Sequence, residues 1–463
     1  MTEAKLSKKG VHKINIKNIV PIVLVFLVAL AVRAIYFTAL HSIAIYPDSV
    51  EYLSSAQKIE SFKIDVSRVP IYPLFIQVAS QILSGFSMER ATVLLQMVTS
   101  SIGVVLVFLI SRNLFKSTIK AFIVSIFCAV SVCLINWDFL VLTESLSIFL
   151  VLLLLLSFMM YMRKKSVVYM IMAFVISGLM MFIRPFYIAF PIMVLMAFLL
   201  YGFLESRVRQ VVVTGVLAIA VIYTCLIGYM YLNMTQNKYF GISDVSVINS
   251  LGKVLQYDMY DLGGNIKIKE LIKKDIESNN GKLPYPKVFI YEHGFNTNNY
   301  SEISDFTKGI MLKHPYMYVS KTVEYMLKGI SGSTVFTDYN TQNYKANWPK
   351  SLFNAVNNLP LVNNFFVIVA LILFESAAII YQAIKKRYYN WNWIFVILII
   401  VYQFGMAIIG ADGEFARLVA PTYILLFLIM FKYLYWLFDI IKDYFSKNAQ
   451  KDNGFDSSYT AVL

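Results

Sequence analysis

The sequence predicts an all-α, polytopic membrane protein with about 10 transmembrane helices. Of its 463 residues, 58% are hydrophobic and only 15% are charged, which leaves too little polar surface for a soluble protein of this length. Apolar runs with almost no charges also recur along the chain. A run of roughly 20 such residues is long enough for a helix to cross the hydrocarbon core of a bilayer, so the recurring runs predict membrane spans.

The expected spans follow the apolar runs. In chain order they are residues 19–40, 88–113, 118–136, 141–162, 166–183, 186–204, 209–232, 361–384, 392–410 and 415–440. Basic residues cluster in alternate connections between these spans, as expected for loops that face the cytoplasm and its anionic lipids. We therefore expect both termini in the cytoplasm and a location in the cytoplasmic (inner) membrane. The net charge of +14 is accounted for by these loops, so we expect no nucleic-acid partner.

The same pattern divides the chain into five parts. They are a cytoplasmic basic tail (1–18), an N-terminal transmembrane module (19–232) that contains the first outer loop (41–87), an extracytoplasmic subdomain with amphipathic helices (233–360), C-terminal transmembrane helices (361–440) and a cytoplasmic tail (441–463). The basic tail carries lysines but no recognisable cleavage site, so we expect no cleaved leader peptide.

The first outer loop is expected to hold two helices that lie on the membrane surface. In "SVEYLSSAQKIESF", Val50, Leu53 and Ala56 recur at helical spacing with polar residues between them, which is typical of an amphipathic helix. The following stretch, "VPIYPLFIQVASQILSGF", is apolar but short, and Pro70 and Pro73 interrupt its start. It is therefore predicted as a second interfacial helix rather than a span.

The large segment 233–360 changes in composition along its length. Its centre is polar and rich in asparagine, which suits a subdomain outside the membrane. The later stretch "DFTKGIMLKHPYMYVSKTVEYMLKGIS" mixes apolar and basic residues at helical spacing on either side of His314 and Pro315. Because a proline disfavours helix at the residue before it, we predict two amphipathic helices with a break at this point.

Charged residues near the apolar runs map to one side of the predicted membrane. These residues are Arg33, Asp48, Glu51, Arg68, Asp138, Glu144, Arg184, Asp412, Glu414 and Arg417. Charges at membrane depth are costly and mark sites or pathways. A carboxylate can take a proton from a hydroxyl group, arginines can bind a phosphate, and paired carboxylates can bind a divalent cation. Helix capping is the alternative role for Asp138 and Glu144, and lipid anchoring is the alternative for Arg33 and Arg184.

Six motifs together resemble the GT-C superfamily of integral-membrane glycosyltransferases, which includes protein O-mannosyltransferases and aminoarabinose transferases. In chain order they are "YPDSVEYLSSAQKI", "SRVPIYPLF", "LTESLSIFLVLLL", "IRPFY", "MLKHPYMYVSKTVEYML" and "GEFARLVAPTYILLFL". The likeness lies in their order and shared sidedness. Two positions depart from the superfamily pattern. Asp48 and Glu51 are three residues apart where many relatives have adjacent acids, and Leu418 follows Arg417 where relatives often have tyrosine.

The resemblance implies a glycosyltransferase that moves a single sugar from a polyprenyl-phosphate donor, its co-substrate, to an extracytoplasmic glycan, lipid or protein. It implies that Asp48 is the general base of an inverting transfer, within a catalytic module of residues 19–232. The residues implied to bind the donor phosphate are Arg417, Arg184 and Arg68. Candidates for contacts with the acceptor, the sugar or a metal are Glu51, Asp138, Glu144 and Glu414. A divalent metal ion stays open as a cofactor, and an enzyme that makes the sugar-phosphate lipid is an expected partner in the pathway.

Two other functions are compatible with the same pattern. A ligase or polymerase of diphosphate-linked glycans also has many spans and a large outer loop, but it relies on loop arginines and histidines rather than on an acid in the first loop. A transporter or flippase of lipid-linked glycans places polar residues at mid-membrane, in paired halves with broken helices. Here the charges cluster at one face and no inverted repeat is visible in the sequence, which favours the enzyme.

Overall fold

The computed structural model describes residues 16–331, 343–357, 365–410 and 415–455. In this part of the chain, eight helices are long and apolar enough to cross a membrane, or nine if one bent pair counts as a span. They are α1 (Ile16–Ala39), α4 (Met88–Phe115), α7 (Glu144–Lys164), α9 (Phe190–Leu204) with the preceding 3-10 turn η1 (Pro185–Tyr187), α10 (Val208–Asn237), α19 (Phe365–Lys386), α20 (Trp391–Gly410) and α21 (Phe415–Phe455). The prediction of an all-α, multi-pass membrane protein is confirmed.

The difference from the ten predicted spans lies in two places. The expected span 118–136 is a bent pair, α5 (Thr118–Val130) and α6 (Val132–Asp138), with an angle of 53° between the two helices. The expected span 166–183 is α8 (Val167–Met181), whose 15 residues reach only about 22 Å. This helix ends early because Arg184 precedes a proline and has an extended backbone conformation, which is incompatible with a continuing helix.

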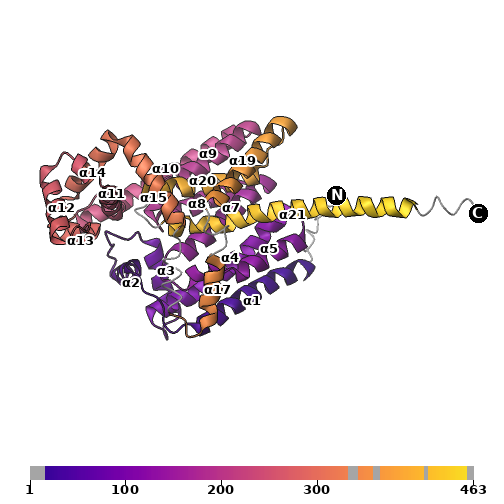
Figure 1. Ribbon diagram of the computed structural model, residues 1–463, viewed down its shortest axis with the longest axis horizontal. Coiled ribbons are helices and arrows are strands. Elements are labelled where there is room, and N and C mark those ends of the chain that lie inside the picture. Colours follow the sequence, from indigo (N-terminus) through magenta and orange to yellow (C-terminus); the bar gives the residue numbers. More distant parts are fainter. Residues whose placement is uncertain (1–15, 332–342, 358–364, 411–414, 456–463) are drawn as a thin grey trace, which may run out of the picture.

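The transmembrane helices run along the long axis of the molecule, as Figure 1 shows. In this view α1 begins and α21 ends toward the right, whereas a cluster of four shorter helices lies at the left, near α2. These four are α11 (Val245–Gln256), α12 (Ile266–Ser278), α13 (Pro286–Glu292) and α14 (Tyr300–Lys313). They enclose an apolar core of their own that includes Leu251, Ile268, Phe289 and Ile303, which explains how a polar segment forms a subdomain beside the membrane helices.

Both helices predicted in the first loop are present, α2 (Pro47–Glu60) and α3 (Ile71–Ile82). The buried face of α2 differs from the expected apolar stripe, because Tyr52 is buried whereas Val50 is 56% exposed. The reason is that the Tyr52 ring packs edge-on against Tyr72 of α3, with 4.8 Å between the ring centroids. An aromatic contact between the two helices therefore sets the rotation of α2.

The predicted break at His314 is also confirmed. Helix α14 ends at Lys313 and α15 (Pro315–Ser331) begins at the proline itself. In Figure 1, α15 crosses the direction of the transmembrane helices, and it contacts α20 and α21. This orientation is the one expected of an amphipathic helix at a membrane surface.

Helix α7 is the centre of the bundle. Of its apolar window, 72% is buried, the largest share among the spans, and it packs against α4, α8, α20 and α21. A helix that is apolar on all sides fits such a position, since no face needs to meet water. Its first residue, Glu144, is therefore also buried, and a charge at this place needs partners from neighbouring helices.

One ion pair inside the bundle joins the two C-terminal helices that flank α20. Glu375 of α19 is fully buried, and Lys432 of α21 donates to both of its carboxylate oxygens, at 2.7 and 2.6 Å. The hydroxyl of Tyr433 also donates to Glu375, at 2.7 Å. Only 11% of the apolar window of α19 is buried in the protein, so this polar contact is a principal attachment of that helix.

Replacing Lys432 with methionine should lower the free energy of unfolding by about 3 kcal/mol, because Glu375 would remain buried without its cation. The matched control is Lys120→Met, which removes the partner of Asp439 on the same helix at an exposed pair and should cost less than about 1 kcal/mol. Unfolding of the purified protein in detergent measures both values. Equal losses in the two variants would contradict the assigned role of the buried pair.

Candidate active site

Seven charged side chains form one continuous chain of contacts at the end of the bundle next to the subdomain. The order of contacts is Lys287, Glu51, Arg68, Asp48, Arg417, Glu144 and Arg184. Positive and negative groups alternate along the whole chain. The residues come from α2, α7, α13 and α21 and from the loops before α3 and η1, so distant parts of the sequence meet here.

Asp48 lies in the first turn of α2, directly after Pro47. Proline at the first helical position and an acid in the first turn are both favoured at a helix N-terminus, which explains why the helix begins here. The carboxylate bridges two arginines, because Oδ1 accepts from Arg68 Nη2 at 2.5 Å and Oδ2 accepts from Arg417 Nη1 at 2.7 Å. Its side chain is 30% exposed and so remains open to a substrate.

The two arginines control the charge state of Asp48. Burial alone would raise the pKa of this carboxyl, but the charges of Arg417 and Arg68 outweigh burial and hold the pKa well below its usual range. Asp48 is therefore ionised at neutral pH. Burial would lower the pKa of Arg68, but its neighbours Tyr52, Asp48 and Glu51 raise this pKa above its already high value.

Arg68 connects Asp48 to the outer part of the cluster. Its Nε donates to Glu51 Oε2 at 2.9 Å, and its guanidinium lies over the ring of Tyr52 at 4.5 Å from the centroid. Stacking on an aromatic ring fixes the plane of a guanidinium. Lys287 of α13 pairs with the other oxygen of Glu51, so the subdomain contributes a cation to the site.

Glu144 connects Arg417 to Arg184 in the buried part of the cluster. Its Oε1 accepts from Arg184 Nη2 at 2.7 Å and from Arg417 Nε. The remaining oxygen, Oε2, and Arg184 Nη1 are buried, and neither has a hydrogen-bond partner among the described residues. Buried polar groups are rarely left unpaired in proteins, and each one needs an explanation, such as a bound water or ligand or a catalytic role.

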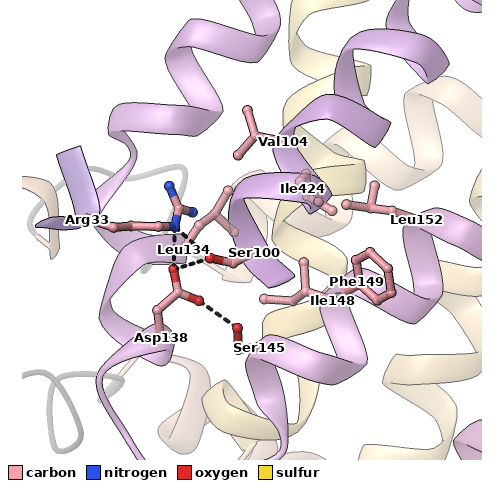
Figure 2. Close-up of a pocket in the computed structure, with 11 residues that line it drawn as sticks. Arg33, Ser100, Val104, Leu134, Asp138, Ser145, Ile148, Phe149, Leu152 and Ile424 are labelled. Atoms are coloured by element: carbon pink, nitrogen blue, oxygen red, sulfur yellow. Dashed lines mark hydrogen bonds and ion pairs between the residues drawn. The ribbon is translucent and has the colours of Figure 1, made fainter. Parts of the chain in front are cut away.

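A second buried ion pair, Arg33 with Asp138, lies apart from this cluster (Figure 2). Arg33 Nε donates to Asp138 Oδ2 at 2.8 Å, and Ser100 and Ser145 donate to the same carboxylate at 2.7 and 2.6 Å. These groups line a cavity whose other walls are mainly apolar, including Leu134 and residues of α7. Every oxygen of the Asp138 carboxylate is thus occupied by the protein itself.

The predicted site residues divide into three groups. Asp48, Glu51, Arg68, Glu144, Arg184 and Arg417 meet in one cluster. Asp138 does not belong to it and pairs with Arg33 instead. Glu414 lies outside the described residues, as do most of the basic tail and the last residues of the chain. Lys287 was missed, because a single lysine in "PYPKVFIYE" carries no signal in the sequence that it reaches the first loop.

The cluster suits an anion better than a cation. It holds four cationic groups against three carboxylates, and the carboxylates already face guanidinium or ammonium groups. Among the described residues, no group of three or more histidine, cysteine, aspartate or glutamate side chains has the arrangement of a metal site. The donor set therefore does not fit a divalent ion without displacing an arginine.

Comparison with known proteins identifies the architecture. Residues 67–228 match a family model described as dolichyl-phosphate-mannose-protein mannosyltransferase. The oligosaccharyltransferase AglB of Archaeoglobus fulgidus, solved with an inhibitory peptide and a dolichol-phosphate, has a TM-score of 0.51 and 15% identity over 93% of this chain. Residues 67–228 thus resemble that mannosyltransferase family, and the fold of the chain is similar to that of the oligosaccharyltransferase.

A second similar structure is an Archaeoglobus fulgidus oligosaccharyltransferase solved with Zn and sulfate, with a TM-score of 0.50 and 15% identity over 91% of this chain. The chain spans about half of each solved protein, 51% and 49%. No curated protein matches its sequence. The segment matched by the family model contains Arg68, Glu144 and Arg184, whereas Asp48 and Arg417 lie outside it.

Replacing Arg33 with methionine should lower the free energy of unfolding by about 3 to 5 kcal/mol, because Asp138 would stay buried without a cation. The double variant Arg33→Met/Asp138→Asn should lose less, since a neutral amide can accept from one of the two serine hydroxyls and donate to the other. Chemical unfolding in detergent measures both. A double variant less stable than the single one would show that charge compensation is not what the pair provides.

Proposed function

We propose that this protein transfers a single sugar from a polyprenyl-phosphate donor to an extracytoplasmic acceptor, with Asp48 as the general base. One observation carries the proposal: Asp48 and Arg417, 369 positions apart in the sequence, are in direct contact at 2.7 Å. An ionised carboxylate beside a phosphate-binding group is what a direct displacement at a sugar phosphate requires. The acceptor is a cell-surface glycan, a lipid or a protein.

The donor phosphate is assigned to Arg417, Arg184 and Arg68. A sugar linked to a lipid monophosphate carries one negative charge, and the leaving group gains a second as the sugar departs. Guanidinium groups stabilise that growing charge, especially where water is excluded. Arg417 and Arg184 are 2% and 7% exposed, so their environment has the low polarity that strengthens such contacts. The structurally similar AglB binds a dolichol-phosphate, which is a lipid monophosphate of this class.

The transfer is a single displacement. The hydroxyl oxygen of the acceptor forms a bond to the anomeric carbon while the bond from that carbon to the phosphate oxygen breaks. The hydroxyl proton passes to Asp48, and the electron pair of the broken bond leaves with the polyprenyl phosphate. Because attack is direct and comes from the face opposite the phosphate, the configuration at the anomeric carbon inverts.

Donor binding also activates the base. In the resting site Arg68 and Arg417 keep the pKa of Asp48 low, which makes the carboxylate a weak base. A phosphate that binds to Arg417 competes with Asp48 for the same guanidinium. The pKa of Asp48 then rises toward the value that suits proton transfer, and the base is strongest when the donor is bound.

The other acids have supporting roles. Glu144 orients Arg417 and Arg184 through Oε1, and its other oxygen, Oε2, can accept a hydrogen bond from a hydroxyl of the sugar. Glu51 orients Arg68. Asp138 receives no contact with substrate in this scheme, since its carboxylate is held by Arg33 and two serines. No step is assigned to a metal ion or to Glu414.

We assign the site to the extracytoplasmic face of the cytoplasmic membrane, with both termini in the cytoplasm. The assignment is supported by the basic loops and by the position of the site at the end of the bundle opposite the start of α1 and the end of α21 (Figure 1). The five-part division of the chain follows from it. The enzyme that makes the sugar-phosphate lipid is the expected partner in the pathway.

Replacing Asp48 with asparagine should reduce transfer at least about 1,000-fold while the protein remains folded in the membrane, because the amide cannot accept the proton. The matched control is Asp439→Asn, which removes a carboxylate from an exposed pair with Lys120 and should leave transfer unchanged. Transfer of a radiolabelled sugar from the lipid donor measures both. Turnover retained in the Asp48 variant would remove this residue from the mechanism.

A comparison of donors distinguishes the enzyme classes. The proposed transferase should accept sugars on polyprenyl monophosphate and release polyprenyl phosphate, whereas a ligase or polymerase uses polyprenyl diphosphate donors. Both substrates are offered to the wild-type protein in proteoliposomes, and the released lipid is identified. Use of the diphosphate donor alone would favour the ligase or polymerase. Movement of intact lipid-linked glycan across the bilayer without transfer would favour the flippase.

Replacing Arg68 with methionine should move the acid limb of the pH profile of kcat/KM to higher pH. In the wild type the pKa of Asp48 is held low, so its ionised form persists as the pH falls to below about 4, the usual range of a carboxyl. In Arg68→Met this pKa rises, and the base is protonated at a higher pH. The pH dependence of kcat/KM measures the shift. The control Lys120→Met should keep the wild-type limb, and an unshifted limb in Arg68→Met would contradict the electrostatic assignment.

A further inference from the structure

We propose that helix α11 and the two residues before it form a brace that fixes Arg68 and Arg417 relative to each other, with Lys253 and Ser243 as positioning residues. The inference rests on the proposed function, because it concerns the two arginines that hold Asp48. It assigns the subdomain a role in positioning the catalytic groups. The two ends of α11 reach two different segments of the membrane module, and each segment leads into one of the arginines.

The N-terminal end of α11 holds the loop before Arg68. Ser243 Oγ donates to the carbonyl of Ser67 at 2.6 Å, and the amide of Asp244 donates to the carbonyl of Val66 at 3.1 Å. Both donors are buried, with exposures of 1% and 0%. These two carbonyls belong to the residues directly before Arg68, so the contacts fix the backbone from which its side chain extends.

The C-terminal half of α11 holds the end of α20. Lys253 Nζ donates to the carbonyls of Ile408 and Ile409, at 2.7 and 2.9 Å, and is only 1% exposed. Asn249 Nδ2 reaches the next carbonyl, that of Gly410, at 3.4 Å. The last carbonyls of a helix carry a partial negative charge, so a lysine is a favourable cap there. Helix α21 begins at Phe415, five residues after Gly410, and carries Arg417 in its first turn.

The brace is rigid because α11 is anchored in the subdomain. Leu251, Val254 and Leu255 belong to its apolar core, and the helix packs against α13 and α14. Asp244 Oδ2 also accepts from Tyr300 of α14, at 3.3 Å. A 12-residue helix spans about 18 Å and does not stretch, so the two segments that it holds keep a constant separation.

The geometry gives a specific functional consequence. Asp48 bridges Arg68 and Arg417, and both guanidinium groups must meet the same carboxylate and then the same phosphate. A displacement of about 1 Å between catalytic groups can cost about 100-fold in rate. A buried lysine that binds main-chain oxygens on a neighbouring helix would therefore be needed for activity although it touches no reacting atom.

The test compares Lys253→Met with Lys269→Met, measured as transfer per folded molecule. Lys269 is the matched control, since it also donates to a main-chain carbonyl, that of Asp261 at 3.3 Å, but at the exposed surface of the subdomain. The brace predicts that Lys253→Met lowers kcat by 10-fold or more and shifts the acid limb of kcat/KM to higher pH. Lys269→Met should match the wild type, and Lys253→Arg should recover most of the activity.

A purely structural lysine would behave differently. It would lower the unfolding temperature of Lys253→Met but leave kcat, KM and the pH limb of the folded fraction at wild-type values, and that result would overturn the proposal. If Lys253→Met does not fold, Ser243→Ala tests the other end of the brace with the same two readouts. Wild-type values in that variant would overturn the proposal equally.

A distance measurement separates this inference from the proposed function. Spin labels are attached at Phe62→Cys, in the exposed loop after α2, and at Leu434→Cys, on an exposed face of α21, with Cys225→Ser removing an exposed native thiol. The brace predicts a broader distance distribution in Lys253→Met than in Lys269→Met. This measurement does not depend on enzyme activity. Failure of the protein to use a lipid monophosphate sugar as donor would refute the proposed function but would leave the brace untouched. Identical distributions would refute the brace.

Discussion

The sharing of one carboxylate between two arginines is the interaction on which the rest of the site depends. Asp48 accepts a hydrogen bond from Arg68 on one oxygen and from Arg417 on the other. Each arginine also pairs with a second acid, Arg68 with Glu51 and Arg417 with Glu144. A buried arginine at the end of a membrane helix is costly unless an anion compensates it. The acids therefore make it possible to keep two guanidinium groups in a largely dry environment.

Compensation of this kind also explains the difference between the two buried ion clusters. The Arg33–Asp138 pair is closed in the sense that both carboxylate oxygens accept hydrogen bonds, from Arg33 and from two serine hydroxyls. These contacts also join α1, α4 and α7. The cluster around Asp48 is incomplete by comparison, since Glu144 and Arg184 each keep one buried polar atom without a partner in the described chain. A closed pair contributes to the fold, whereas an incomplete one has capacity left for a ligand.

The sequence was sufficient for the class of fold and for six of the charged residues that meet in one cluster. Hydropathy predicts spans well because a helix is the conformation that satisfies its own backbone in lipid, and the first-loop helices and the break at His314 follow from local patterns. It was not sufficient for side-chain partners. Asp138 and Glu144 look equivalent in "INWDFLVLTES", but the bend between α5 and α6 turns one toward Arg33 and leaves the other beside Arg417. Lys253 and Lys287 act through contacts more than 150 residues away, which no local pattern encodes.

The contact between Asp48 and Arg417 has a consequence for biogenesis. Asp48 leaves the ribosome early, in the loop after the first span, whereas Arg417 begins the last span described here. At ordinary rates of synthesis, 369 residues correspond to an interval on the order of tens of seconds. During that interval Asp48 has Arg68 as a partner, but the carboxylate oxygen that later accepts from Arg417 has no cation to pair with. Completion of the site is therefore a late event, and a chain interrupted before α21 is inserted lacks the contact between Asp48 and Arg417.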